Sequence, residues 1–234
     1  VYRPDYLKIY PTLVVRGTRV YDRWRRDEFE PLDNDTAADI VAEVMGMIPE
    51  YTRLQRVQRD IPADFIDAGV WKSNLRQLAA QRADERGIEQ RDIRAREAGM
   101  NEAAPDPDAV ELNVTTYEVA GGTEHFLAFE DPVADLLVGF CRLRFPADPV
   151  RRELTDAAVV RELHVYGSEA GIGSGEGEWQ HKGYGRQLLR RAEELAADAG
   201  FDKLAVISGI GAREYYRRKL GYHQDGPYVS KRLE

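Results

Sequence analysis

The stretch GYGRQLLRRAEELAADAG, residues 183–200, decides the fold of the second half of this 234-residue chain. Its apolar residues recur at helical spacing and predict an amphipathic helix that ends at Gly200. The residues before it, 180–182, complete the pattern Q-x-x-G-x-G, whose glycines let the backbone approach a ligand closely. Because unpaired amides and the positive end of the helix dipole meet at a helix start, the pattern indicates an anion-binding site. An ordinary helix start is the alternative.

Outward from this helix, the sequence predicts a sheet. Four strand candidates separated by turn signals precede the helix: VELNVTTYEV (110–119), EHFLAFED (124–131), DLLVGFCRLRF (135–145) and AAVVRELHVYG (157–167). After it come a short buried strand, KLAVIS (203–208), a short helix, AREYYRRKLGY (212–222), and an extended end, PYVSKRLE (227–234). We therefore predict a mixed, mostly antiparallel sheet with helices.

In the first half of the chain, strand and helix candidates alternate, which is typical of an α/β layer. We expect a strand, a bend and an extended segment over 6–21, a helix from Asn34 capped by Asp35 or Thr36, a short strand at Leu54 and Val57, and a helix over 70–86 that Gly87 ends. This half is too short to close a barrel alone. We predict an α/β domain over 1–87, a charged, proline-containing linker over 88–109 and a second domain over 110–234.

The composition is that of a globular protein, with 43% hydrophobic and 32% charged residues and a net charge of −8. The acidic surplus argues against a generally basic nucleic-acid binder and leaves room only for a local basic patch. No apolar run approaches the roughly 20 residues of a membrane helix, so we expect no membrane partner. The single cysteine, Cys141, excludes an internal disulfide and favours a cytoplasmic setting. Since the chain begins with Val1, we expect it to be cut from a longer protein.

The order of elements in the second half, an antiparallel meander followed by strand, loop, long helix, strand and short helix, resembles the GNAT acetyltransferases. This resemblance implies that the chain binds acetyl-CoA, with the pyrophosphate on the helix start and the pantetheine arm along a strand edge. The residues implied for this binding lie in the loop and helix start (Gln180, Lys182, Gly183, Tyr184, Gly185, Arg186), on the preceding strand (Glu162, Leu163, His164, Val165) and on a later helix (Tyr216).

Two adjacent tyrosines follow on the short helix. Because neighbouring helix residues point about 100° apart, one can face the core and the other the cofactor. In GNAT enzymes a tyrosine here can protonate the leaving thiolate; we favour Tyr216, with Tyr215 as the near alternative and packing of both rings as the other interpretation. His164 and Glu162 share one strand face and are candidates for the base that thioester hydrolysis needs. Strand packing and a surface carboxylate are the alternative there.

A narrower resemblance extends over nearly the whole chain. Seven short segments resemble the archaeal type of the Elongator catalytic-subunit family. They are VQRDIP (57–62), GVWKSNLRQLA (69–79), RDIRAREAG (91–99), RELHVYG (161–167), QHKGYG (180–185), ISGIGAREYYRRKLGY (207–222) and DGPYVSK (225–231). LKIYPTLVVRGT (7–18) resembles a later strand region of that family's radical S-adenosylmethionine domain. The resemblance implies a partial α/β radical-domain remnant followed by a complete GNAT domain.

The family's chemistry, as the resemblance implies it, activates the methyl group of acetyl-CoA with a deoxyadenosyl radical. The carbon radical then adds to the wobble uridine of tRNA, and thioester hydrolysis leaves a carboxymethyl group. The [4Fe–4S] cluster of this family needs a cysteine triad, which a chain with one cysteine lacks. S-adenosylmethionine and the cluster are therefore expected only in the full-length family enzyme. We expect no metal here, because the stretch 88–99 contains no cysteine where family members carry metal-binding ones.

Basic residues are concentrated before residue 100 and are candidates for contact with the tRNA backbone; they are Arg53, Arg56, Arg59, Lys72, Arg76, Arg91, Arg94 and Arg96. Exposed ion pairs with nearby acids are the alternative for each of them. The resemblance thus predicts a fragment that binds acetyl-CoA and supplies its acetyl group to tRNA. The alternatives are a conventional lysine or small-amine N-acetyltransferase and a non-catalytic module that docks tRNA and senses CoA. A homodimer and Elongator-type partner subunits both remain open.

Overall fold

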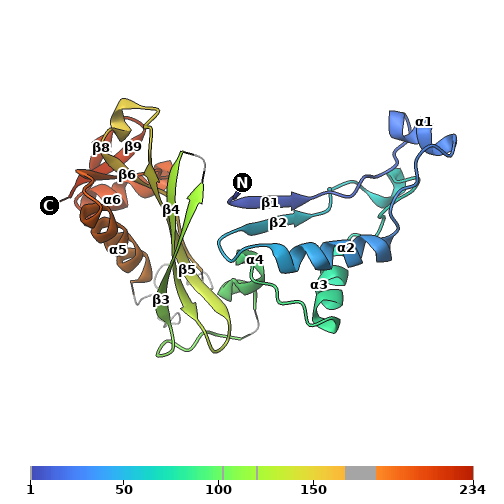
Figure 1. Cartoon of the computed structure of the whole chain (residues 1–234), viewed down its shortest axis with the longest axis horizontal. Coiled ribbons are helices and arrows are strands. Elements are labelled where there is room, and N and C mark those ends of the chain that lie inside the picture. The colour runs from blue at the N-terminus through green and yellow to red at the C-terminus, as the bar shows by residue number, and fades with distance from the viewer. Residues whose placement is uncertain (1, 102, 120, 167–182, 234) are drawn as a thin grey trace. The chain divides into compact units, whose positions relative to one another are not determined.

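The computed structural model describes residues 2–101, 103–119, 121–166 and 183–233 (Figure 1). The chain divides into two compact units, Pro4–Ala95 and Val1–Arg3 with Arg96–Glu234. The boundary lies within the predicted linker, 88–109, but the first part of that segment is packed into the first unit. Asp92 accepts a hydrogen bond from the backbone N–H of Leu54 at 3.1 Å, and Ile93 is fully buried.

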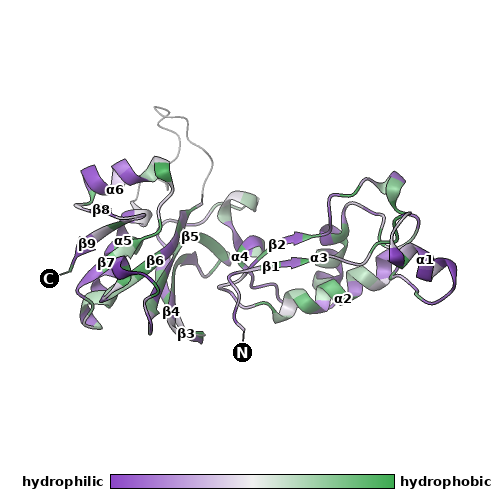
Figure 2. Cartoon of the chain, turned by 90° about the horizontal axis from the view of Figure 1, so that it is seen from above, coloured by the Kyte–Doolittle hydropathy of each residue, from purple (hydrophilic) through white to green (hydrophobic). Residues whose placement is uncertain are grey.

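The first unit contains a parallel strand pair and three helices of more than four residues. Its elements are β1 (Tyr6–Ile9), α1 (Arg19–Arg25), α2 (Asn34–Met47), β2 (Arg53–Val57), the short 3-10 turn η1 (Ala63–Phe65), α3 (Leu75–Glu85) and α4 (Ile93–Arg96), whose last residue belongs to the second unit. Strand β1 pairs with β2, and the apolar faces of α2 and α3 complete the core with Leu54 and Val57. Hydrophobic and hydrophilic residues interchange along α2 in Figure 2, as expected for a helix that covers a core on one side.

The helix boundaries differ from the predicted ones for local reasons. Asp33, rather than Asp35 or Thr36, caps α2, since its Oδ1 accepts from the N–H of Thr36 at 2.7 Å. The predicted helix over 70–86 begins only at Leu75, and Gly87 follows its end with φ +66°. Helix α1 overlaps only the end of the segment 6–21 that is predicted to be a strand, a bend and an extended stretch, and the rest of the helix is not predicted. None of its residues is buried, so it has no apolar periodicity to reveal it.

The second unit is built on a seven-stranded sheet with the order β3-β4-β5-β6-β7-β9-β8. Its elements are η2 (Ala98–Met100), β3 (Glu111–Val119), β4 (Gly122–Asp131), β5 (Leu136–Pro146), η3 (Arg152–Leu154), β6 (Ala157–Val165), α5 (Tyr184–Asp198), β7 (Lys203–Val206), η5 (Ile210–Ala212), α6 (Arg213–Lys219), β8 (His223–Asp225) and β9 (Tyr228–Arg232). All strand pairs are antiparallel except β6 with β7. The predicted mixed, mostly antiparallel sheet is confirmed.

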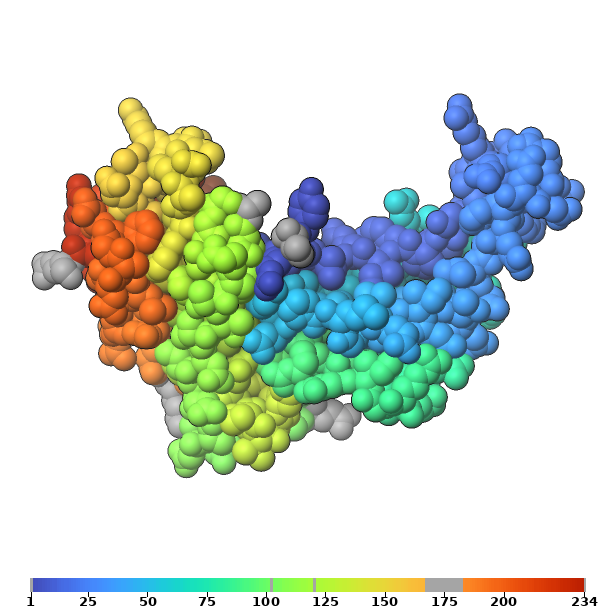
Figure 3. Space-filling view, in the orientation of Figure 1, coloured from blue at the N-terminus to red at the C-terminus, as the bar shows by residue number. Residues whose placement is uncertain are grey.

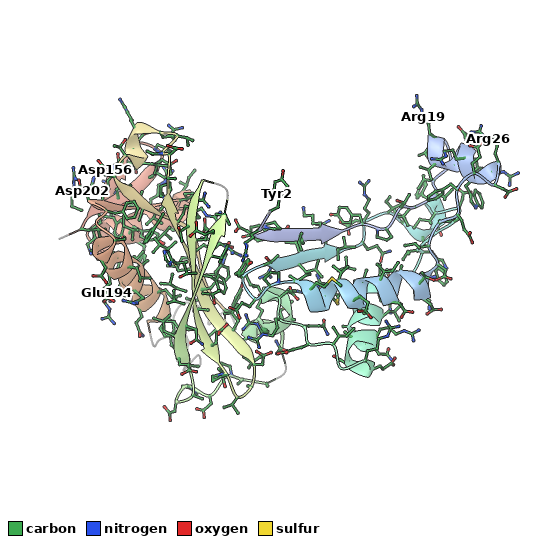
Figure 4. The ribbon with its side chains drawn as sticks, viewed as in Figure 1. Tyr2, Arg19, Arg26, Asp156, Glu194 and Asp202 are labelled. Atoms are coloured by element: carbon green, nitrogen blue, oxygen red, sulfur yellow. The ribbon has the colours of Figure 1, made fainter. Side chains whose placement is uncertain are left out.

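Helix α5 packs on one face of this sheet (Figure 1) and contributes Leu188, Leu189, Ala192 and Ala196 to the core. Most of the atoms visible from α5 onward, coloured orange to red, lie together at the left of Figure 3. The N–H of Asp202 donates to the carbonyl of Asp156 at 3.1 Å, which brings the starts of β6 and β7 together; both side chains are labelled in Figure 4. No helix among the described residues combines the length and the apolarity needed to cross a bilayer.

Candidate active site

The parallel strands β6 and β7 separate halfway along β6. Their pairing runs from Ala157–Lys203 to Val160–Val206, and the N–H of Ile207 then donates to the carbonyl of Val160 at 2.9 Å. Beyond that point, among the described residues, β6 pairs only with β5. A bulge helps to open this edge, because Leu143 opposes Val160 while Arg142 opposes Glu162, which leaves Arg161 as the extra residue. The backbone of 161–165 can therefore receive an extended, amide-bearing ligand.

The start of α5 lies against this open edge. A Cβ atom on Gly185 would stand 3.5 Å from Val165 Cγ2 and 3.6 Å from Leu163 Cδ2, so the glycine brings helix and strand close together. Gly183 takes the left-handed conformation with φ +71° and starts the helix, and its carbonyl accepts from the N–H groups of Arg186 and Gln187. The earlier amides have no intrahelical acceptor and carry the positive end of the dipole, which suits a pyrophosphate. The predicted Gln180 and Lys182 lie outside the described residues.

A groove of about 470 Å³ runs beside the helix start. Among the described residues, four cations line it: Arg186 and Arg190 from α5, Lys219 from α6 and Lys231 from β9. Glu193 is the acid in this lining, and it accepts from Lys231 Nζ at 2.8 Å and from the Tyr222 hydroxyl at 2.8 Å. The described residues therefore give this lining a positive net charge, which suits the phosphates of a nucleotide. Sequence reasoning found Arg186 but missed Arg190, Lys219 and Lys231, which only the fold brings together.

The two adjacent tyrosines of α6 have different environments, as the helix geometry requires. Tyr216 is 7% exposed and meets the ring of Tyr222 edge-on at 5.6 Å, whereas Tyr215 is 48% exposed. No described residue forms a hydrogen bond with the Tyr216 hydroxyl. Burial, with a smaller contribution from Cys141, raises its pKa to about 12. A hydroxyl that keeps its proton at neutral pH fits the role of a proton donor.

The base candidates form a hydrogen-bonded chain with a buried arginine. Glu162 Oε1 lies 3.0 Å from His164 Nε2, and Glu162 Oε2 accepts from Arg142 Nε at 2.8 Å. Arg142 is 1% exposed, while the side chain of His164 is 55% exposed. Glu162 and His164 therefore lie on the same face of β6, as predicted. The sequence analysis did not include Arg142, because this residue lies on a different strand, β5. The only sequence signal for it is that Arg142 and Arg144 are two residues apart and so share one face of that strand.

Cys141 is next to Arg142 on β5, so its side chain lies on the opposite face of the sheet. It is fully buried in the core with Tyr184 and Tyr216. Burial raises the pKa of its thiol far above the ordinary value, so the reactive thiolate is absent. We expect iodoacetamide to alkylate the native protein at least about 100-fold more slowly than the protein unfolded in urea. Mass spectrometry of timed samples measures this ratio; equal rates would contradict the buried position.

The candidates for RNA contact differ widely in their surroundings. Arg96 is 2% exposed and donates to Glu130 Oε1 at 2.6 Å, so its prediction as a phosphate contact is corrected to a structural role. Arg76 donates to the carbonyl of Leu54, and burial lowers its pKa, which also marks it as structural. Ion pairs engage Arg56 with Asp60, and Arg91 with Glu50 and Glu89. Arg53 and Arg94 are half-buried.

Arg59 and Lys72 remain beside a surface pocket of about 660 Å³ in the first unit. Trp71, 57% exposed, lies in the same lining, and the Lys72 ammonium is 6.0 Å from the centre of its ring. Arg59 lies 5.3 Å from the centre of the Tyr10 ring. Cations beside exposed aromatic rings are the combination that single-stranded nucleic acids contact.

A split parallel strand pair, a glycine-started helix against the split and a cationic groove beside that helix define an acyl-CoA-binding fold of the acetyltransferase type. The model of the Acetyltransferase (GNAT) family matches residues 88–222, and that of the Radical_SAM C-terminal domain matches residues 4–85. The chain therefore belongs to the Acetyltransferase (GNAT) family, preceded by the end of a radical S-adenosylmethionine domain. The predicted fold class is confirmed.

The relatives confirm the resemblance to the Elongator catalytic subunit. The tRNA uridine(34) acetyltransferase of Methanocaldococcus infernus is 44% identical over 99% of this chain and 45% of its own length. Elongator complex protein 3 of Dictyostelium discoideum is 46% identical over 99% of this chain and 42% of its own length. The structure of an N-terminally shortened Elp3 from M. infernus is 43% identical with a TM-score of 0.90, covering 98% of this chain and 56% of that one. The chain thus spans less than half the length of the curated relatives it matches.

Proposed function

We propose that this chain binds acetyl-CoA in its GNAT unit and presents the acetyl group to a tRNA wobble uridine. The separation of β6 from β7 beside the glycine-started helix carries this proposal. The residues proposed for binding are the backbone of Leu163, His164 and Val165, the helix start from Gly183 to Arg186 and the groove cations. The proposed catalytic side chains are Tyr216 as proton donor, with Tyr215 as the alternative, and the His164–Glu162 pair on the base side.

When bound, the thioester supplies an activated acetyl group. The described residues bind its phosphates, align its amides along β6 and hold protons at the Tyr216 hydroxyl and the His164 ring. S-adenosylmethionine chemistry does not fit this chain, because its one cysteine is buried in the GNAT core and cannot form a ligand triad. The radical step belongs to residues outside these 234, and a cytoplasmic location with tRNA and Elongator-type partners is part of the same proposal.

The direct test measures CoA released from acetyl-CoA by the 234-residue chain, with and without tRNA. We expect release that tRNA stimulates. Acetylation of a peptide amine without tRNA would favour a conventional N-acetyltransferase instead. Acetyl-CoA binding without any tRNA-stimulated release would favour a docking and sensing module, and the absence of both binding and release would refute the cofactor assignment.

The groove predicts a specific loss of acetyl-CoA affinity. Arg186 lines the groove at the first turn of α5, where a guanidinium can donate charge-assisted hydrogen bonds to phosphate. We expect Arg186→Ala to weaken acetyl-CoA binding about tenfold, the equivalent of roughly 1.4 kcal/mol. Titration calorimetry measures the Kd. Arg191→Ala is the matched control, since Arg191 lies on the same helix, pairs with Glu194 and does not line the groove; an equal loss in both variants would contradict the assignment.

The pocket beside Trp71 predicts a salt-dependent loss of tRNA affinity. We expect the double variant Arg59→Ala with Lys72→Ala to bind tRNA more weakly and to lower the slope of log K against log salt by roughly 1.4, for two phosphate contacts to single-stranded RNA. Filter binding at several salt concentrations measures the slope. The double variant Arg19→Ala with Arg26→Ala is the control: both arginines are exposed at the ends of α1 and are labelled in Figure 4. A slope unchanged from wild type would remove this pocket from the RNA surface.

A further inference from the structure

The sheet face away from α5 carries a fixed chain of polar groups across β5 and β6. It begins at Arg142, whose guanidinium lies 5.4 Å from the centre of the Phe126 ring and 5.2 Å from that of Phe140. Two aromatic contacts and a 1% exposed side chain restrict the plane of the guanidinium. Its Nε–H donates to Oε2 of Glu162 at 2.8 Å, so the carboxylate is held from the buried side.

Glu162 is engaged at both oxygens. Oε2 accepts from Arg142 and Oε1 lies 3.0 Å from His164 Nε2, while the side chain is only 14% exposed. A carboxylate in this arrangement orients a neighbour rather than collecting a proton from solvent. Of the two base candidates, Glu162 is therefore the orienting group.

His164 is the exposed end of the chain. With Nε2 donating to Glu162, the neutral imidazole keeps its lone pair on Nδ1. The ring is nearly parallel to that of Tyr166, at 9° and 6.3 Å between centroids, and lies 5.5 Å from the Phe140 ring centroid. Its backbone belongs to the stretch of β6 that lacks a β7 partner among the described residues, so the ring stands beside the proposed path of the thioester.

We infer that Arg142 is a positioning residue which, through Glu162, fixes the tautomer of His164 so that Nδ1 serves as the base for thioester cleavage. The inference rests on the proposed function. Nδ1 takes a proton from water as the water oxygen bonds to the acetyl carbon. The C–S bond then breaks, its electron pair leaves on sulfur, and the sulfur receives a proton from the Tyr216 hydroxyl. The acetic acid formed loses its proton to become acetate, His164 returns its proton to solvent, and the Tyr216 hydroxyl regains a proton from solvent. The products are therefore acetate, CoA and one released proton.

Two readouts test the inference on the full 234-residue chain. The first is the ring ¹H–¹⁵N correlation spectrum of the histidines, which reports the tautomer without any ligand; we expect His164 as the Nε2–H form in wild type. In Arg142→Lys, which keeps the charge but loses the planar Nε contact, we expect a mixture of tautomers. Glu162→Gln is the second variant, because it keeps the shape of the side chain and leaves Arg142 in place while it removes the carboxylate. We expect it also to change the His164 signals.

The second readout is tRNA-stimulated CoA release. We expect His164→Gln to lower kcat about 100-fold and Arg142→Lys about tenfold, with the acetyl-CoA Kd within about twofold of wild type in both. Arg144→Lys is the matched control, since Arg144 lies on the same strand and face but donates to Glu124 at 3.2 Å. It should change neither readout.

The outcomes separate the two proposals. No CoA release by wild type despite acetyl-CoA binding would overturn both the base role and the hydrolytic function. Normal wild-type release that His164→Gln leaves intact would overturn the base role alone. An unchanged His164 tautomer and kcat in both Arg142→Lys and Glu162→Gln would overturn the positioning role, whereas a coupled change in tautomer and kcat would support it.

Discussion

Tyr216→Phe should slow tRNA-stimulated CoA release about 100-fold, the size of effect typical for the loss of a positioned proton donor. The Tyr216 residue is 7% exposed, no described residue forms a hydrogen bond with its hydroxyl, and burial raises its pKa to about 12. Because the hydroxyl makes no hydrogen bond with the described residues, its removal breaks none of their contacts. The melting temperature should therefore stay unchanged, while the rate falls.

The pH dependence follows from the direction of that pKa shift. An acid is effective while it holds its proton, and a raised pKa extends the protonated range upward. The ratio of wild-type to Tyr216→Phe rate should stay constant from pH 7 to pH 10, because the hydroxyl releases its proton only near pH 12. A tyrosine with an ordinary pKa would lose the advantage through pH 10.

Two neighbouring tyrosines are the controls for this experiment. Tyr222→Phe removes a hydroxyl that donates to Glu193 at 2.8 Å, so it should cost about 1 kcal/mol of stability and leave the rate unchanged. Tyr215→Phe tests the alternative donor. A rate loss in Tyr215→Phe with none in Tyr216→Phe would move the role to the exposed tyrosine, and equal rates in all three variants would leave the leaving thiolate without a tyrosine donor.

The sequence predicted the sheet well because several of its strands alternate in hydrophobicity and turn residues separate them. Four consecutive strands appear where the pattern placed them, from β3 (Glu111–Val119) to β6 (Ala157–Val165). The same reasoning missed α1, whose residues have no buried face, since periodicity is a record of burial. Local signals thus predict elements that pack, and fail for elements that do not.

The candidate site was predictable only where neighbours in sequence are neighbours in space. Glu162 and His164 are two apart on one strand, so their shared face could be read directly. Arg142 joins them through a bulge that shifts the register by one residue, and no single-sequence pattern reveals such a shift. Lys219 and Lys231 join Arg186 only because α6 and β9 each bring one lysine to the start of α5.

Charge runs are the weakest sequence signal for function, as Arg96 shows most clearly. Arg96 lies in an arginine-rich stretch and was therefore predicted to contact RNA. Its guanidinium is instead buried and donates to Glu130. Glu130 also accepts from Asn113 Nδ2 at 3.1 Å. Arg96→Met should destabilise the protein by about 3 kcal/mol, because it leaves a nearly buried carboxylate without its cation. For a chain of this size the melting temperature should fall by roughly 10 °C.

A double variant separates the ion pair from the shape of the site. Arg96→Met with Glu130→Gln removes both charges, so it should recover most of the stability lost by Arg96→Met alone. At temperatures where Arg96→Met is folded, this single variant should bind tRNA with the affinity and the salt slope of wild type, because the buried guanidinium of Arg96 contacts no phosphate. A lower salt slope with an unchanged melting temperature would return Arg96 to the RNA surface. An unchanged salt slope with a lower melting temperature would show that the Arg96–Glu130 ion pair stabilises the fold around β4.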